Sequence, residues 1–587
     1  MNIQEQINAL VQVALGKEPA DLVITSGNLV NVYSAEVLEG HSISIKGDKI
    51  AFVGPDASHT IGKETKVIDA QGKFLLPGFI DAHFHFTDVA PDEFIGYSAP
   101  TGTTTIFAEL DLGTVVGYEG TTALLDNMKG QPIKFFGLAP SIPQPPQFLP
   151  RERVPISCEE VESLLQREDV VGLGETLWIG VLEGDKDLIT NIRATLNRKK
   201  KLEGHASGAK GYKLAAYVAS GISSCHESIN AQEAMDKLRL GMCVMIREGS
   251  IRRDLEAISS LKGKDIDFRR LALVTDGIGA EDLAHFGHMN YIVQKAIDLG
   301  IPATKAIQMA TLNPAEHFGL DNLIGGIAPG KCADILILPS LAKIECELVI
   351  SNGRIIAKDG ELLIKPRKCI FPDSVMESLH VPRKFSPADF DVPARDRKDK
   401  VKVRIMKLIT EVITQEYQVE LHIRGNRIKM DVERDILKVS VIDRKDNTGE
   451  VVTGFVQGFG LKSGAFASSY SWELGSPIVA VGADEEDMAM GVNRVIELQG
   501  GLVVTKNGEV IAELPLPVGG CMAGESLSKV IEGYQAVKEA VKNLGSSLMD
   551  PYLTLQTLPG TFLPYFRITL QGFADMKNKK VVALIVD

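Results

Sequence analysis

The spacing of hydrophobic and polar positions changes from one segment of this chain to the next. Residues 22–78 form short runs in which apolar and polar positions alternate, and this pattern predicts short β-strands joined by turns. Residues 332–363 show the same alternation. Between these two segments, apolar runs of strand length alternate with stretches of helical periodicity. Residues 1–20 predict an amphipathic helix ahead of the first strands.

The middle segment, residues 79–320, predicts an α/β fold of the (β/α)8 TIM-barrel type. Eight apolar runs alternate there with helical stretches, which is the order of elements in such a barrel. Polar residues end nearly every run, and the C-terminal ends of barrel strands form the catalytic face. The runs are FLLPGFIDAHFH, TGTTTIFAEL, IKFFGLAPSI, VVGLGETLWIG, KKKLEGHAS, VASGISSCHE, GMCVMIREGS and RRLALVTDG.

The remaining segments predict two further domains, as expected for a chain too long for one hydrophobic core. Residues 1–78 and 321–380 are expected to form one small β-sandwich, built from both flanks of the barrel. Residues 381–403 contain proline and charge with little periodicity, which predicts a linker. Residues 404–587 predict a C-terminal α/β (α+β) domain, in which Asp484 can cap a helix.

Composition and charge narrow the classes of function. The chain has 44% hydrophobic and 24% charged residues, as ordinary globular proteins do. Its net charge of −13 argues against nucleic-acid and membrane partners, because both require a basic surface. No apolar run predicts a membrane span, and the first residues do not resemble a signal peptide. The seven cysteines are scattered, so we expect a cytoplasmic protein without a disulfide framework.

Histidine is scarce, and several of the 11 histidines end predicted strands. His83 and His85 occupy alternate positions of the first strand, so both imidazoles can face one metal ion. Alone, this pair is a weak signal, because two polar residues at a strand end need not bind anything. Four more candidate ligands end other runs: Glu175, His205, His226 and Asp276. Together the six predict a site for Zn, Mn or Fe, with a carboxylate able to bridge two ions.

Longer motifs follow one another in a fixed order along the chain. They include PGFIDAHFH, GLGE, EGHASG, GISSCHE, REGS, VTD and GGIAPGKCADILIL, followed by GFVQGFGLKSGAFASS and DPYLTLQTL. This series resembles the amidohydrolase superfamily and, within it, the bacterial adenine deaminases. The resemblance implies two divalent metal ions, Mn or Fe before Zn, that activate a water for attack on C6 of adenine. It also implies a purine or related heterocycle as the only partner besides a second copy of the chain, in a homodimer or larger homo-oligomer.

The same resemblance assigns a role to each candidate ligand. One ion would be held by His83, His85 and Asp276, the other by His205 and His226, with Glu175 bridging. A carboxylate is then needed to move the proton of the attacking water. Asp276 is the first candidate for that task, and Glu227 is the second.

The sequence departs from the family pattern at four places. The family's Asp-Pro-His-Glu is Glu109-Leu110-Asp111-Leu112 here, and its Ser-Asp-His-Glu is Ser224-Cys225-His226-Glu227. Its paired Asp-Asp is Asp276-Gly277. Its His-rich loop aligns with the segment around Trp472, which has no histidine. None of the six ligands is lost, so we expect a hydrolase. Two interpretations of the departures stay open: a pocket re-specified for another substrate, or lineage drift with the family activity retained.

Further residues are candidates for substrate contact. Arg247 and Glu248 end the seventh strand and could orient a substrate, or form an ion pair at the barrel rim. His288 precedes a predicted helix and is expected to have a substrate-side or capping role. The set of predicted substrate contacts is Arg247, Glu248, Glu109, Asp111, Leu112, Trp472 and His288.

Three functions remain open at this point. The first is hydrolytic deamination of a purine, with adenine giving hypoxanthine and ammonia. The second is a cyclic amidohydrolase that opens the ring of an oxidised purine such as xanthine, or of a related lactam. The third is a non-catalytic scaffold that binds metal or ligand. Release of ammonia separates the first from the second, and bound metal separates both from the third.

Overall fold

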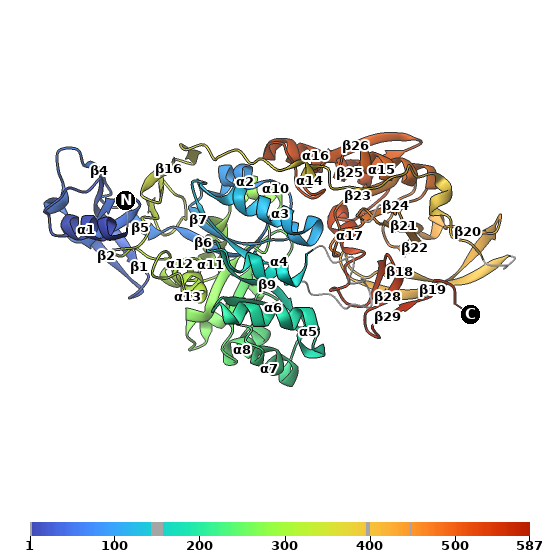
Figure 1. Ribbon diagram of the computed structural model, residues 1–587, viewed down its shortest axis with the longest axis horizontal. Helices are drawn as coiled ribbons and strands as arrows, with labels where there is room; N and C mark the ends of the chain where they lie inside the picture. The colour runs from blue at the N-terminus through green and yellow to red at the C-terminus, as the bar shows by residue number, and fades with distance from the viewer. Residues whose placement is uncertain (1–2, 142–155, 395–398, 446–447, 587) are drawn as a thin grey trace.

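The computed structural model describes residues 3–141, 156–394, 399–445 and 448–586. Three units follow one another along the long axis: a β unit that carries the N-terminus, a central barrel, and a C-terminal domain (Figure 1). Within the described ranges, every helix is too short or too polar to span a bilayer.

The central unit is the predicted eight-stranded barrel. Its parallel strands form two sheets, β6 to β10 and β11 to β13. Two backbone hydrogen bonds join the sheets: Asp276 N–H donates to His83 O at 3.1 Å, and Ser223 N–H donates to Leu202 O at 3.0 Å. The strands are β6 (Phe79–His85), β7 (Thr103–Glu109), β8 (Lys134–Ala139), β9 (Val170–Leu177), β10 (Lys201–His205), β11 (Ser224–Cys225), β12 (Cys243–Arg247) and β13 (Leu271–Val274).

Apolar side chains fill the barrel, and helices cover its outside. Ile80, Phe107, Leu138 and Met245 belong to one buried cluster that draws on most of the strands. Such a filled interior leaves the strand ends as the place for polar groups. The covering helices are α2 (Pro91–Ser98), α3 (Leu112–Met128), α4 (Cys158–Leu164), α5 (Trp178–Glu183), α6 (Lys186–Asn197), α7 (Gly211–Ala219), α8 (Ala231–Arg239), α9 (Leu255–Ile258), α10 (Ala280–Phe286), α11 (Met289–Asp298), α12 (Ala303–Met309) and α13 (Leu312–Phe318).

The two flanks of the barrel meet in one β unit. Strand β5 pairs antiparallel with β14, so that Leu75 lies opposite Ile337. Ile24, Ile43 and Ile350 share the buried core with them. The nine strands form one hydrogen-bonded sheet, in which β4 pairs with β1 beside the main order of strands. They are β1 (Leu22–Asn31), β2 (Glu36–Lys46), β3 (Lys49–Gly54), β4 (Lys66–Asp69), β5 (Phe74–Pro77), β14 (Ile335–Leu338), β15 (Leu348–Ser351), β16 (Arg354–Lys358) and β17 (Glu361–Leu362), with helix α1 (Ile3–Ala14) preceding them.

The C-terminal domain combines a nine-stranded sheet, a three-stranded sheet and helices. In helix α15, Asp484 accepts hydrogen bonds from the N–H groups of Glu486 and Asp487, as expected for a cap. The larger sheet contains β18 (Lys400–Leu408), β19 (Thr414–Arg424), β20 (Arg427–Ile428), β21 (Ile436–Ile442), β22 (Val451–Gln457), β23 (Ala465–Ser468), β24 (Ile478–Gly482), β25 (Gly501–Lys506) and β26 (Glu509–Pro515). The smaller contains β27 (Phe566–Thr569), β28 (Gly572–Asp575) and β29 (Lys580–Val582); the helices are α14 (Asp373–Met376), α15 (Glu485–Glu497), α16 (Leu527–Asn543) and α17 (Pro551–Thr557).

The prediction of a linker over residues 381–403 is wrong in part. Phe390 ends a short 3-10 helix and is buried against the same core as α15. Strand β18 begins at Lys400, and Val401 and Val403 are buried at alternate positions. These apolar positions were too few to show a period in the sequence. Residues 395–398 of the predicted linker lie outside the described residues.

The C-terminal domain reaches the loops that follow the barrel strands. Ala523 N–H donates to Asp88 O at 3.0 Å, beyond the end of β6. Gly475 N–H donates to Thr114 O at 2.9 Å, in the first turn of α3 after β7. An ion pair joins Lys579 to Glu183 at the end of α5. The domain therefore contacts the catalytic face of the barrel at several strand ends.

A buried arginine holds the loops that face the barrel. Arg444 is 2% exposed and donates to Ser469 O at 3.0 Å, Ser378 Oγ at 2.8 Å and Gly519 O at 2.8 Å. Hydrogen bonds from a charged group to buried acceptors are among the stronger ones, and an unpaired buried carbonyl is costly.

We expect Arg444→Met to destabilise the C-terminal domain by about 3 kcal/mol, because two buried carbonyls and a hydroxyl lose their donor. For a domain of this size that loss corresponds to a fall of at least about 5 °C in the unfolding midpoint, measured by circular dichroism. The matched control is Arg424→Met, which changes an exposed arginine of β19 and should shift the midpoint little. Equal shifts in the two variants would contradict the role given to Arg444.

Candidate metal centre

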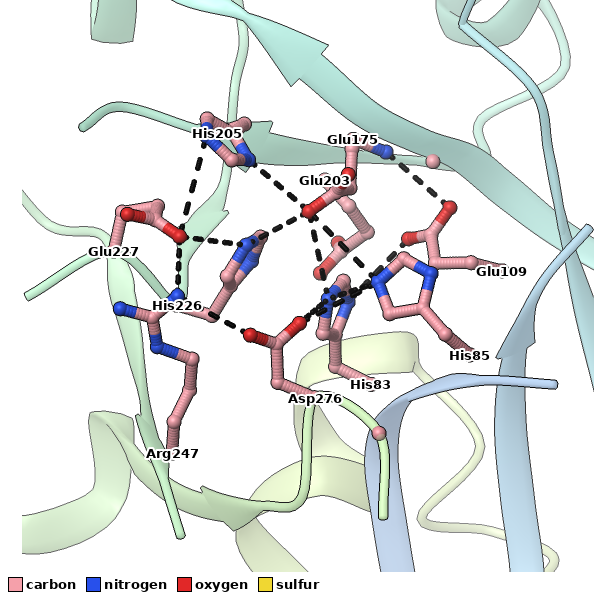
Figure 2. Close-up of polar contacts among 12 residues, drawn as sticks. His83, His85, Glu109, Glu175, Glu203, His205, His226, Glu227, Arg247 and Asp276 are labelled. Atoms are coloured by element: carbon pink, nitrogen blue, oxygen red, sulfur yellow. Dashed lines mark hydrogen bonds and ion pairs between the residues drawn. The ribbon is translucent and has the colours of Figure 1, made fainter. Parts of the chain in front are cut away.

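The six candidate ligands converge at one mouth of the barrel (Figure 2). His83 and His85 end β6, Glu175 lies on β9, and His205 ends β10. His226 follows β11, and Asp276 follows β13. Asp276 has a φ of +63°, a conformation uncommon for residues other than glycine, and such strain is often found at functional sites.

The first part of the cluster joins His83, His85 and Asp276. Asp276 Oδ1 lies 3.1 Å from His83 Nε2 and 3.4 Å from His85 Nε2. The two Nε2 atoms are 3.2 Å apart. Metal–nitrogen bonds are about 2.0–2.1 Å long, so ligand atoms of one ion lie at about this spacing. The three side chains therefore fit a single divalent ion.

The second part centres on the carboxylate of Glu175. Its Oε1 lies 2.8 Å from His226 Nε2 and 3.1 Å from His205 Nδ1. The same oxygen is 3.7 Å from His83 Nε2, which belongs to the first part. One carboxylate oxygen thus lies between two groups of imidazoles, as a ligand that bridges two ions would. Nitrogen and carboxylate donors in this mixture suit Mn, Fe or Zn.

Burial and neighbouring charges together determine the pKa values of this cluster. Burial lowers the pKa of His226 to about 4, so the imidazole is neutral and has a lone pair to offer. Burial alone would raise the pKa of Asp276, but the neighbouring histidines hold it well below its usual value. The pKa of Glu175 is likewise held well below its usual value against burial, by His205 and His226. Burial lowers the pKa of His83, but hydrogen bonds to Asp276 and Glu109 raise it to about 10. The carboxylates of the cluster are thus balanced here by imidazolium charge, which a bound cation would replace.

Two acidic residues contact the imidazoles from behind. Asp111 Oδ2 accepts a hydrogen bond from His85 Nδ1, which leaves Nε2 directed into the cluster. Glu109 Oε1 lies 3.4 Å from His83 Nδ1, and burial raises the pKa of Glu109 to about 7. Both residues were predicted as substrate contacts. Their geometry is instead that of groups that orient metal-binding histidines.

Arg247 borders the cluster and contacts three carboxylates. Its Nη1 pairs with Glu227 Oε1 and lies 3.2 Å from Asp276 Oδ2, while Nη2 lies 2.9 Å from Asp254 Oδ2. Glu227 Oε1 is 3.5 Å from His226 Nε2. The guanidinium fork predicted for a substrate is therefore occupied by the protein's own acidic groups. This favours a role in positioning Glu227 and Asp276.

Two predicted substrate contacts, Glu248 and His288, lie apart from the cluster. Glu248 directly follows β12, is buried, and pairs with Lys295 at 2.6 Å. His288 is buried; its Nδ1 is 2.9 Å from Thr103 Oγ1, and its Nε2 is 3.2 Å from Asp81 Oδ2. His288 also makes no side-chain cap to helix α11. Both side chains are therefore engaged with protein groups outside the six candidate ligands, and their predicted contact with substrate stays a prediction.

Asp81 is a site-supporting residue that sequence reasoning missed. It is fully buried and accepts hydrogen bonds from His83 N at 3.3 Å and Thr275 Oγ1 at 2.6 Å. It thereby ties β6 to the end of β13, next to two candidate ligands. The signal was present in the motif IDAHFH, where a buried carboxylate precedes the histidines.

The remaining departures from the family pattern lie at the boundary with the C-terminal domain or in the turn after β13, where Asp276 and Gly277 have positive φ. Leu112 is buried beside Gly519 of the C-terminal domain. Trp472 stacks on Phe562, with ring centroids 6.0 Å apart. Gly277 has a φ of +114°, a region that favours glycine, so a second aspartate there would be strained.

Comparison with known proteins agrees with this geometry. The amidohydrolase family matches residues 74–356, and the adenine deaminase C-terminal domain matches residues 411–580. An adenine deaminase of Moorella thermoacetica is 39% identical to this chain, covering 99% of it and 98% of the relative. Adenine deaminases of Clostridium botulinum and Cenarchaeum symbiosum are each 36% identical, covering 99% of this chain and 98% and 96% of theirs. The chain belongs to the adenine deaminase family.

Proposed function

We propose that this protein hydrolyses adenine to hypoxanthine and ammonia, using two divalent metal ions at the barrel mouth. The observation that carries the proposal is the position of Glu175 Oε1, within 3.9 Å of nitrogens from four imidazoles. His83, His85 and Asp276 would hold one ion, and His205 and His226 the other, with Glu175 shared. The full-length likeness to adenine deaminases supports adenine as the substrate.

Bound divalent ions lower the pKa of a water ligand and so make a nucleophile available at neutral pH. Water supplies the oxygen of hypoxanthine and two protons, one for the leaving amino group and one for the ring nitrogen N1. A carboxylate at the mouth must therefore accept and return protons. Asp276 and Glu227 are the candidates, because Arg247 contacts both and holds them beside the imidazoles.

The proposal also covers the identity of the metal, the oligomeric state of the protein and its location in the cell. Mn or Fe is proposed, with Zn as the alternative, because histidine and carboxylate ligands accept all three ions. A homodimer is proposed from the family resemblance. A cytoplasmic location is supported by the seven cysteines, which form no disulfide within the described residues. Ring opening of a cyclic amide could use the same kind of centre, but no contact in the site favours it.

Purified protein loaded with Mn should convert adenine into hypoxanthine and ammonia in a one-to-one ratio. Mass spectrometry would follow the purine while a coupled assay measures ammonia. Removal of the metal by a chelator should abolish turnover, and Mn should restore it. A product heavier by one water, formed without ammonia, would instead identify a ring-opening hydrolase.

We expect Glu175→Gln to lower bound metal, because a neutral amide cannot balance two cations. Activity on adenine should fall by at least about 100-fold. Elemental analysis would give the metal content of each variant. His285→Ala, which removes an exposed histidine outside the cluster, should keep both the metal and the activity. If Glu175→Gln binds as much metal as the unchanged protein, the bridging role is wrong.

Glu227→Gln and Asp276→Asn should separate proton transfer from metal binding. Glu227→Gln should retain the metal and lower kcat by about 100-fold or more, because a proton carrier is lost. Asp276→Asn should lose metal as well as activity. An unchanged kcat in Glu227→Gln, measured at full metal content, would leave Asp276 as the proton carrier.

A further inference from the structure

One loop of the C-terminal domain brings an aromatic side chain to the metal centre. Residues 558–565, here called the aromatic loop, connect α17 to β27. Within it, the ring of Phe562 meets the ring of His205 edge-on, with centroids 6.4 Å apart. Phe562 also stacks on Trp472, with centroids 6.0 Å apart and an angle of 24° between the planes. A candidate metal ligand of the barrel thus adjoins an aromatic pair of another domain.

The accessible side of the centre lies where the aromatic loop approaches. The side chain of His226 is 3% exposed, whereas that of Glu175 is 30% exposed and that of His205 is 13% exposed. His85 is 14% exposed, so the centre is open over Glu175 between His85 and His205. The aromatic loop lies on the His205 side of this opening. Phe562 stands beside this opening and is itself 36% exposed. Its ring has apolar surface that the protein leaves uncovered.

Buried polar groups hold the aromatic loop in place. Arg567 is fully buried and donates to three backbone carbonyls: Thr557 O at 3.0 Å, Pro564 O at 3.2 Å and Val412 O at 2.8 Å. At the tip, Thr561 N–H donates to Glu473 Oε2 at 2.8 Å. Tyr565 has a φ of +77°, which costs energy for an aromatic residue and persists only where the surroundings impose it. The loop is therefore a fixed part of the fold.

The metal centre and the aromatic pair of Phe562 and Trp472 offer a heterocyclic substrate complementary kinds of contact. The six ligands offer polar contacts, which suit the reacting edge of a heterocycle. The faces of a purine ring are apolar and polarisable, and they bind to aromatic side chains by stacking. The pair of Phe562 and Trp472 supplies such a surface beside the metal centre.

We propose that Phe562, supported by Trp472, is a substrate-binding residue that stacks on the purine ring, so that the C-terminal domain completes the active site. The inference rests on the purine substrate proposed above. Arg567 is then a positioning residue, which acts through the aromatic loop and does not touch the substrate.

The two tryptophans of the chain, Trp178 and Trp472, permit a test that does not depend on turnover. In a Trp178→Phe background, all indole fluorescence comes from Trp472. Hypoxanthine, which the enzyme does not consume, should quench this fluorescence as it binds. Phe562→Ala in the same background should weaken hypoxanthine binding and raise KM for adenine by about tenfold. The metal content should stay unchanged and kcat should change much less than KM.

Three further variants serve as controls. Phe562→Tyr keeps an aromatic face and should retain affinity, whereas Phe562→Leu keeps only bulk and should lose it. This comparison decides the role even if Phe562→Ala fails to fold. Tyr417→Ala removes an exposed aromatic side chain from β19 of the same domain and should alter neither binding nor KM.

Wild-type affinity and KM in Phe562→Ala and Phe562→Leu would overturn the inference. Failure of the proposed function is distinguishable, because it would show as no ammonia from adenine in the metal-loaded parent protein. In that case quenching by purines that is lost in Phe562→Leu would still sustain a stacking role. No quenching by adenine or hypoxanthine would overturn the stacking role, whatever the ammonia assay shows.

Discussion

The carboxylate of Glu175 is surrounded by imidazoles from three barrel strands, and the rest of the site is arranged around that charge. Removing an ionised carboxylate from water costs several kcal/mol unless opposite charges or donors surround it. The neighbouring His205 and His226 hold its pKa well below the usual value although burial raises it. A divalent cation would satisfy the same oxygen more strongly. This explains why ligands distant in sequence must end at one mouth.

The barrel meets this constraint through strand geometry and through a supporting layer of polar residues. Asp81 binds the backbone of His83 and the side chain of Thr275, so the ends of β6 and β13 stay together. Asp111 fixes the tautomer of His85 from behind. Such contacts to ligating histidines determine ring orientation as much as the strand does. Asp81, Thr275 and Asp111 are not candidate ligands themselves, but they hold the ligands in place around the carboxylate of Glu175.

The C-terminal domain uses buried arginines to fix the loops that face the barrel. Burial lowers the pKa of Arg444 to about 10 and that of Arg567 to about 9, so both remain charged at neutral pH. Their acceptors are mainly backbone carbonyls, which a charged donor satisfies without a second buried ion. Both arginines therefore give definite shape to loops that would otherwise have few contacts.

Sequence alone determined the barrel, the order of its strands and the six residues that meet at its mouth. Those predictions depended on local patterns: alternation along a strand, polar residues at strand ends, and motifs in family order. The contacts of Glu248 and His288 could not be predicted from the sequence. The direction of a side chain at a strand end, and the packing of a helix against that strand, depend on residues distant in sequence. Phe562 was missed because nothing in TFLPYF marks it. Only the tertiary structure, by docking the C-terminal domain on the barrel, decided that this ring lies beside His205.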